Sequence, residues 1–178
     1  MKIGIDVSQL AYPNTGVANY LKNLVSHVIA QDTKNQYILF ASSLRRKEML
    51  QKELAEFGSR PNVSIKLLSF PPSFLDFVWN RLHVFPIEYV LGKLDVFISS
   101  DWTQPPSNAK KVTILYDLIV YTYPNETSQK IVDVQKRKLS WVTKEIDKII
   151  CISKSTKEDA KKILGIPEEK LEVIYPGF

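Results

Sequence analysis

The chain has 178 residues and a formal net charge of +5, with 44% hydrophobic and 24% charged residues. These values are typical of one globular domain, and no apolar run approaches the roughly 18 residues that a membrane-spanning helix needs. The N-terminus reaches Asp6 too soon to contain a secretory apolar region, and the lone Cys151 excludes an internal disulfide. We therefore expect a single domain in the cytoplasm.

Strand and helix patterns alternate along the whole chain. This alternation is typical of βα units and predicts an α/β fold, a Rossmann-like, doubly wound and mostly parallel sheet of about seven strands. The predicted strands are residues 2–7, 36–41, 63–68, 95–99, 111–116, 148–152 and 171–175. The predicted helices are residues 17–30, 44–57, 73–91 with a break near Pro86, 127–146, and one that runs from Ser155 to Gly165.

The last thirty residues are the most informative segment. Ser155 to Glu158 matches a capping box, which predicts a helix start there. Gly165, followed by Pro167, predicts the helix end. After the strand that follows, residues 176–178 are typical of a linker, so we expect a further domain beyond this chain.

Basic residues form clusters, and the sequence leaves open whether these clusters bind a partner. Solvated helix faces account for them, and contact with anionic lipid head groups or polyanionic substrates is the alternative. Nucleic acid is not an expected partner, because aromatic residues are not interleaved with the basic ones. The clusters are Arg45, Arg46 and Lys47; Lys130, Arg137 and Lys144, with Lys136 and Lys138 beside them; and Lys157, Lys161 and Lys162.

Ligands of parallel sheets bind beyond the carboxyl ends of the strands, which directs attention to the loops there. In the first loop, Thr15 is a candidate helix cap, and Gly16 would let a phosphate approach the free amides. An ordinary turn glycine explains the pattern equally well. The three-glycine dinucleotide fingerprint and the phosphate loop with lysine are missing, so neither a dehydrogenase nor a nucleotide triphosphatase is predicted.

Two later loops carry residues suited to carbohydrate. Asp101 and Trp102 combine a hydrogen-bond acceptor with an apolar ring face, although Trp102 could equally pack under the neighbouring prolines. Tyr116 and Asp117 follow the fifth strand and are expected at the mouth of the crevice. Asp117 could hold sugar hydroxyls there or bind free amides of its own loop.

A metal site is not predicted. His27 and His83 lack companions at ligand spacing, and His83 is expected to be half-buried with its hydrogen bonds satisfied. The aromatic stretch around His83, with Phe70 and Phe74, is expected to pack in the core, and an apolar surface for a lipid-linked acceptor is the alternative.

Several segments together resemble, over the whole chain, the N-terminal domain of a retaining glycosyltransferase of group 1, also called family 4, which has the two-domain GT-B fold. Within that family the chain is most similar to mannosyltransferase-like members that build surface polysaccharides. The segments are residues 3–6 with 15–20, 79–86 with 94–97, 115–118 with 123–124, 147–159, and the most specific, 164–177.

The resemblance implies transfer of a sugar from a nucleotide-diphosphate sugar to a hydroxyl of a saccharide or lipid-linked acceptor. It implies retention of configuration, no metal and no cofactor. Thr15 and Gly16 would meet the donor diphosphate, and the donor-binding C-terminal domain would be absent from this chain, which we expect to be inactive alone. The remaining implied positions are Asp101, Trp102, Tyr116 and Asp117 around the acceptor and the transferred sugar, and Ser153 and Ser155 on the cleft floor.

The chain departs from the family at two places. Tyr116 stands where a sugar-contacting histidine is usual, which bears on donor choice and activity, and Ala18-Asn19 replaces a Gly-Arg pair that supplies a cation. Two other functions stay open. One is a carbohydrate- or lipid-binding module that partners a separate catalytic subunit, and the other is a flavodoxin-like sensor. The sensor is disfavoured because Asp6 alone, without a cluster of acids, ends the first strand.

Overall fold

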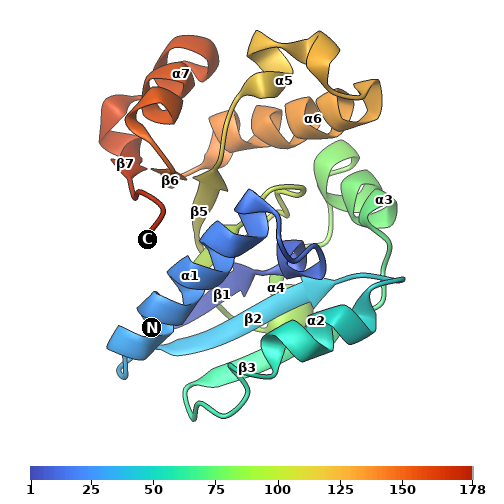
Figure 1. Cartoon of the computed structure of the whole chain (residues 1–178), viewed down its shortest axis with the longest axis vertical. Coiled ribbons are helices and arrows are strands. Elements are labelled where there is room, and N and C mark those ends of the chain that lie inside the picture. The colour runs from blue at the N-terminus through green and yellow to red at the C-terminus, as the bar shows by residue number, and fades with distance from the viewer. Residues whose placement is uncertain (178) are drawn as a thin grey trace.

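The computed structural model describes residues 1–177, in which seven strands form one all-parallel sheet (Figure 1). The strand order is β3-β2-β1-β4-β5-β6-β7, so the direction of winding reverses between β1 and β4. This is the doubly wound, Rossmann-like arrangement, and the predicted fold class is confirmed.

The strands are β1 (Lys2–Asp6), β2 (Gln36–Ser42), β3 (Val63–Leu68), β4 (Val96–Ser99), β5 (Lys110–Leu115), β6 (Lys148–Cys151) and β7 (Leu171–Val173). The α-helices are α1 (Gly16–Gln31), α2 (Lys47–Leu54), α3 (Pro72–Leu75), α4 (Glu88–Leu91), α5 (Ile119–Thr122), α6 (Gln129–Glu145) and α7 (Lys154–Leu164). Shorter turns are η1 (Ser8–Ala11), η3 (Pro124–Glu126) and η4 (Glu168–Lys170), and η2 (Asp76–Arg81) is a π-helix.

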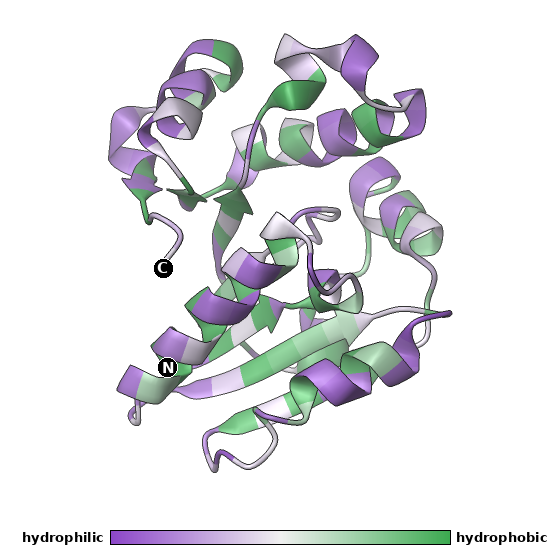
Figure 2. Cartoon of the chain, viewed as in Figure 1, coloured by the Kyte–Doolittle hydropathy of each residue, from purple (hydrophilic) through white to green (hydrophobic). Residues whose placement is uncertain are grey.

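Helices cover both faces of the sheet, which explains why β2 is an almost continuous apolar run. α1, α2 and η1 pack against one face of β1 and β2, and α3, η2 and α4 pack against the other. A third apolar cluster joins α5, α6 and α7 to β5, β6 and β7. Figure 2 shows the same division, with apolar residues along the strands and polar residues on the outer turns of the helices.

The segment from 73 to 91 is less regular than predicted. After α3 and η2 the chain leaves the helical path near Leu82, where His83 and Phe85 have φ angles of 52° and 60°, and it becomes helical again only at α4. Trp79 is buried, but most of the surrounding aromatic residues are not. The prediction that they pack in the core is wrong for Phe70, Phe74, Phe77 and Phe85, which are 43–65% exposed.

The start of α7 corrects the predicted capping box. Ser153, which follows β6 after one intervening residue and is extended, is the N-cap, and its Oγ accepts the Thr156 N–H at 3.1 Å. Ser155 already lies inside the helix, so its hydroxyl is too late to cap it. The predicted end is confirmed, since Gly165 adopts the left-handed conformation at φ 65°.

Within residues 1–177, the structure contains no helix of the length and apolarity required to cross a membrane.

Candidate active site

A cavity of about 940 Å³ opens where the strand order reverses, at the carboxyl ends of β1, β2 and β4. This is the position at which doubly wound sheets bind ligands. Loops after these strands supply one wall, while α3, η2 and the first half of α6 supply the other. The polar lining includes Asp6 and Ser8 at the end of β1, Ser42 and Ser43 at the end of β2, and Ser100, Asp101 and Thr103 after β4.

Two carboxylates lie in this cavity. Asp6 is 5% exposed, and its Oδ1 accepts the Ser8 N–H at 2.9 Å. Asp101 is half-buried, and its Oδ1 accepts from Nε2 of Gln135 on α6 at 2.9 Å. Burial raises the pKa of both carboxyls, and the nearby ammonium of Lys138 acts in the opposite direction.

The buried ammonium of Lys138 interacts electrostatically with both carboxylates. Lys138 belongs to α6, is 2% exposed, and its Nζ donates to the Ser100 carbonyl and, at 3.0 Å, to Thr113 Oγ1. Burial lowers the pKa of this lysine to about 8, although Asp101 and Asp6 favour its charged form. The structure therefore places one cation and two anions within electrostatic reach of each other, and none of these three groups forms a direct ion pair within residues 1–177.

The π-helix η2 holds the loop that carries Trp102. Asn80 Nδ2 donates to the Trp102 carbonyl at 2.9 Å, and Asn80 Oδ1 accepts the Gln104 N–H at 3.0 Å. Asp76 Oδ1 accepts a hydrogen bond from Asn80 Nδ2 at 3.0 Å, and Asp76 Oδ2 pairs with Arg137 Nη2 at 2.7 Å. π-helical turns often occur at functional sites, and here the turn fixes the wall of the cavity.

A smaller cavity of about 240 Å³ shares Asp101 and Trp102 with the large one and is also lined by Tyr116 and Asp117. Tyr116 lies beneath the crevice and not at its mouth, because its ring is buried edge-on against Tyr20 in the core. Its hydroxyl is 3.2 Å from Ser100 Oγ, and burial raises the pKa of the phenol well above its ordinary value. The phenol therefore stays protonated at neutral pH and serves as a hydrogen-bond partner.

Asp117 combines the two roles considered for it. Its side chain is exposed, and its Oδ1 accepts the Ile119 N–H at 3.0 Å. One oxygen thus orders its own loop, while the side chain still borders the small cavity.

The other predicted site residues, Thr15, Gly16, Ser153 and Ser155, line neither cavity. Thr15 Oγ1 caps α1 by accepting the Ala18 N–H at 3.2 Å. No described atom lies within 4 Å of the position that a Cβ on Gly16 would take, so packing does not require glycine there. Ser155 is exposed at the first turn of α7.

Sequence reasoning missed Asp6, Lys138 and the network of Asp76, Asn80 and Arg137. Asp6 ends the first strand, and the rule of carboxyl ends could have found it. Lys138 was grouped with solvated lysines, which is wrong, since it lies four residues before Val142 on the flank of the buried stripe of α6.

His83 agrees with its prediction. It stacks on Trp141 with 3.7 Å between ring centroids, and its Nε2 lies 3.3 Å from Glu145 Oε2. Within the described residues, no group of three or more His, Cys, Asp or Glu side chains is placed to hold a metal ion.

Comparison with known families gives one match. The family model for glycosyltransferase family 4 matches residues 14–178, a segment that contains every predicted site residue and all strands except β1. A comparison with curated proteins finds no match. Because the family match spans most of the chain, this chain belongs to glycosyltransferase family 4.

Proposed function

We propose that the chain is the acceptor-side domain of a retaining, metal-independent glycosyltransferase that acts in surface polysaccharide or glycoconjugate synthesis. Family membership implies a nucleotide-sugar donor and an acceptor. The observation that carries the proposal is the cavity at the strand reversal, whose lining includes Asp6, Asp101 and Trp102.

The large cavity suits the acceptor. Its volume of about 940 Å³ is at the upper end of the roughly 300–1,000 Å³ usual for small-molecule sites. Carboxylates and serine hydroxyls are hydrogen-bonding partners for sugar hydroxyls, and Trp102 offers an apolar face to a sugar ring. We infer a saccharide or a lipid-linked saccharide as acceptor.

Residues along the remaining carboxyl edge would meet the donor. The open space beside Gly16 and the free amides of α1 suit a diphosphate, with Thr15 beside it. Tyr116 and Asp117 would border the transferred sugar from the small cavity. Ser153 caps α7 and Ser155 lies in its first turn, so both would place the start of this helix next to the same sugar.

A donor-binding domain outside these residues completes the proposed enzyme, so we expect the 178-residue chain alone to be inactive. The test is a thermal-shift and turnover screen of nucleotide sugars with the chain alone and with the chain joined to its native continuation. Saturation at a hundredfold excess over Kd should stabilise the joined form by about 2.7 kcal/mol. Turnover by the isolated chain would contradict the proposed inactivity.

Failure of every nucleotide sugar to stabilise the joined form, combined with saccharide binding by the chain, would favour the alternative. In that case the chain is a carbohydrate-binding module that partners a separate catalytic subunit.

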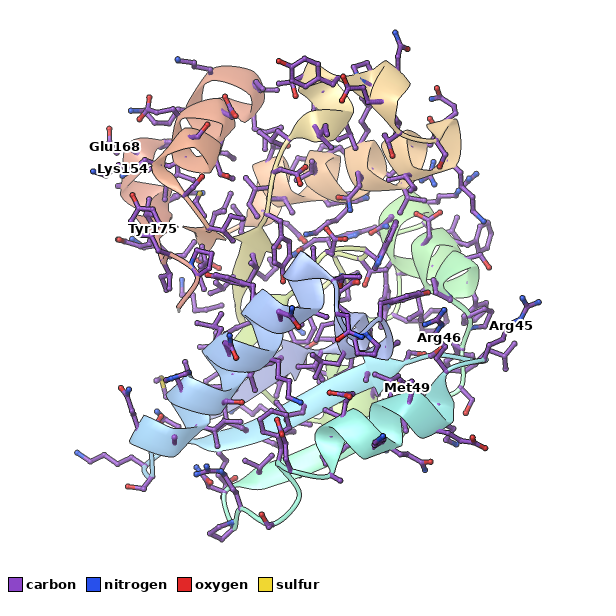
Figure 3. The ribbon with its side chains drawn as sticks, viewed as in Figure 1. Arg45, Arg46, Met49, Lys154, Glu168 and Tyr175 are labelled. Atoms are coloured by element: carbon purple, nitrogen blue, oxygen red, sulfur yellow. The ribbon has the colours of Figure 1, made fainter. Side chains whose placement is uncertain are left out.

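An aromatic surface beside the cavity supports a lipid-linked acceptor at an anionic membrane. We define this surface as the exposed aromatic residues of the segment 70–89, in which Phe70 and Phe74 stack on each other and Phe77 lines the cavity. Its members are Phe70, Phe74, Phe77, Phe85 and Tyr89, which are 43–80% exposed. Figure 3 shows Arg45 and Arg46 together at the start of α2, with Arg45 extending away from the molecule. We propose peripheral attachment at the cytoplasmic face of the inner membrane.

Vesicle co-sedimentation tests this attachment. We expect binding to phosphatidylglycerol vesicles, weaker binding to phosphatidylcholine vesicles, and loss of binding when Phe74 and Phe85 are both replaced by serine. Tyr175→Ser is the matched control, because Tyr175 is 56% exposed and lies on the opposite side of the molecule from Arg45 and Arg46 (Figure 3). Equal vesicle binding by the double serine variant and by Tyr175→Ser would show that the aromatic surface does not attach the chain to membranes.

A further inference from the structure

The wall of the large cavity that η2 and α6 form carries an excess of positive charge around Asp76. This aspartate is 7% exposed, and its Oδ2 lies 2.7 Å from Arg137 Nη2 and 3.6 Å from Arg81 Nε. All three residues line the cavity. Two guanidinium groups therefore share one carboxylate, and this group of three, the arginine cluster, keeps one positive charge.

The fold needs only one of the two arginines to satisfy Asp76. Arg137 donates to both carboxylate oxygens, from Nη2 at 2.7 Å and from Nε at 3.3 Å, so this pair already neutralises the buried carboxylate. The Arg81 side chain is 56% exposed, and within residues 1–177 its contact with Asp76 at 3.6 Å is its single polar contact. An exposed ion pair of this kind adds little stability, so the guanidinium of Arg81 is available to a ligand.

A buried hydroxyl without a partner lies in the loop that η2 holds. Asn80 on η2 binds this loop at residues 102 and 104, the two neighbours of Thr103. Thr103 is 3% exposed and lines the cavity, and its hydroxyl makes no hydrogen bond within residues 1–177. This hydroxyl opens onto the cavity, because Glu88 Oε2 is the single fully enclosed side-chain atom without a partner in the same range. Buried hydroxyls are normally hydrogen-bonded, so Thr103 lacks a partner that a ligand in the cavity would supply.

The start of α6 adds positive potential at this cavity. Ser128, Lys130 and Ile131 line the cavity, and the first turn of this 17-residue helix contains no acidic residue. The positive end of the helix dipole and the ammonium of Lys130 therefore favour an anion there. Asp133 lines the cavity one turn later and opposes this effect, but its Oδ1 is bound to Gln129 Nε2 at 2.8 Å.

We propose that Arg81, Arg137 and Thr103 form a phosphate-binding site, and that the acceptor of the proposed reaction carries a phosphate group. This inference rests on the proposed function and adds an anionic group to its acceptor. A guanidinium group matches phosphate oxygens with parallel N–H donors, and the Thr103 hydroxyl donates one further hydrogen bond. The phosphate belongs to a lipid-linked saccharide or to a soluble sugar phosphate.

Isothermal titration calorimetry of the 178-residue chain with inorganic pyrophosphate tests the site. We expect the wild-type chain to bind, Arg81→Met to bind at least about tenfold more weakly, and Thr103→Val to bind about fivefold more weakly. Both variants should fold, because Arg81 is exposed and valine has nearly the shape of threonine. Arg60→Met, which is exposed and outside both cavities, is the matched control and should bind as the wild type does.

Two results of this titration would overturn the inference. One is the absence of pyrophosphate binding by the wild-type chain. The other is binding by Arg81→Met and Thr103→Val that equals binding by Arg60→Met, because the ion would then bind elsewhere on the chain.

Two further probes distinguish the sources of the phosphate. A lipid-linked acceptor predicts that farnesyl diphosphate binds at least about tenfold more tightly than pyrophosphate, because its chain covers apolar surface at Phe77, which lines the cavity. A soluble sugar phosphate predicts instead that mannose 1-phosphate binds more tightly than inorganic phosphate by a similar factor. If neither probe gains affinity over its inorganic ion, the site does not recognise an acceptor and the inference falls.

The failure of this inference and of the proposed function can be told apart with the chain joined to its continuation. Arg81→Met should raise the KM for a phosphorylated acceptor and leave the KM for the nucleotide sugar unchanged. If sugar transfer proceeds and Arg81→Met changes neither KM, the function stands and this inference falls. If pyrophosphate binds through Arg81 and Thr103 but no nucleotide sugar is ever turned over, the phosphate site stands and the glycosyltransferase proposal falls.

Discussion

The two halves of the sheet's carboxyl edge differ in how their polar groups are satisfied. At the β1/β4 half, Asp6, Asp101 and Lys138 are buried or half-buried without direct ion pairs within residues 1–177. At the β5/β6 half, polar groups bind one another: Thr156 Oγ1 donates to the Tyr116 carbonyl at 3.2 Å and lies 3.0 Å from Ser153 Oγ. Burial of charge in the first half costs stability, whereas in the second half these hydrogen bonds satisfy the polar groups.

The largest effect expected to test this comparison is the pH dependence of the free energy of unfolding that Lys138 contributes. Its folded pKa of about 8 lies below the ordinary 10.5, so between these values the unfolded chain holds more protons and the free energy of unfolding rises with pH. The increment should be on the order of 3 kcal/mol. Lys138→Met should lack it, as chemical denaturation from pH 7 to 10.5 would reveal.

Lys136→Met is the control for this measurement and should keep the rise. Burial raises the pKa of Cys151 to about 11, which lowers stability over part of the same range in every variant, so the difference between variants isolates Lys138. Parallel curves for the wild type and Lys138→Met would show that the lysine is not a buried cation, and the contrast between the two halves would lose its main support.

The next effect concerns the pair that anchors the cavity wall. Arg137→Met removes the nearer ion-pair partner of Asp76, at 2.7 Å, from a side chain that is 10% exposed, and leaves only Arg81 Nε at 3.6 Å. We expect a loss of about 2 kcal/mol, less than for a fully buried pair. Amide hydrogen exchange of Gln104, whose N–H donates to Asn80 Oδ1, should become faster, because Asp76 then holds Asn80 less firmly.

Lys130→Met, exposed on the same helix, should change neither stability nor exchange. Should Arg137→Met prove as stable as Lys130→Met, the loop would owe its position to something other than η2.

The smallest effect distinguishes two serines at the β5/β6 half. Ser153→Ala removes the N-cap of α7 and should cost about 1 kcal/mol in thermal or chemical unfolding. Ser155→Ala should change stability by less than about 0.5 kcal/mol, because its hydroxyl is exposed within the first turn. The reverse order would restore the capping box predicted from the sequence.

The sequence was sufficient for the fold and insufficient for half of the site. Alternating strands and helices, and the glycine that ends α7, depend on local patterns that a sequence displays. Asp101, Trp102, Tyr116 and Asp117 were found because they follow strands.

The remaining parts depend on contacts between distant segments. Lys138 reaches Ser100 and Thr113 across the sheet edge, and Asn80 holds a loop 22 residues away. Helical spacing gives the direction of the Lys138 side chain, but it does not show that two aspartates from distant loops act on its charge. The exposed phenylalanines were misjudged for the same reason, since composition does not reveal which face of a short helical segment is covered.

The most direct test of the central claim is a titration of the isotope-labelled chain with methyl α-mannoside and N-acetylglucosamine, followed by amide chemical shifts. The account predicts that shifts concentrate at Asp6, Ser8 and residues 100–103, which line the large cavity, and leave residues 153–156 nearly unchanged. Shifts confined to residues 153–156, with the β1/β4 half unaffected, would contradict it.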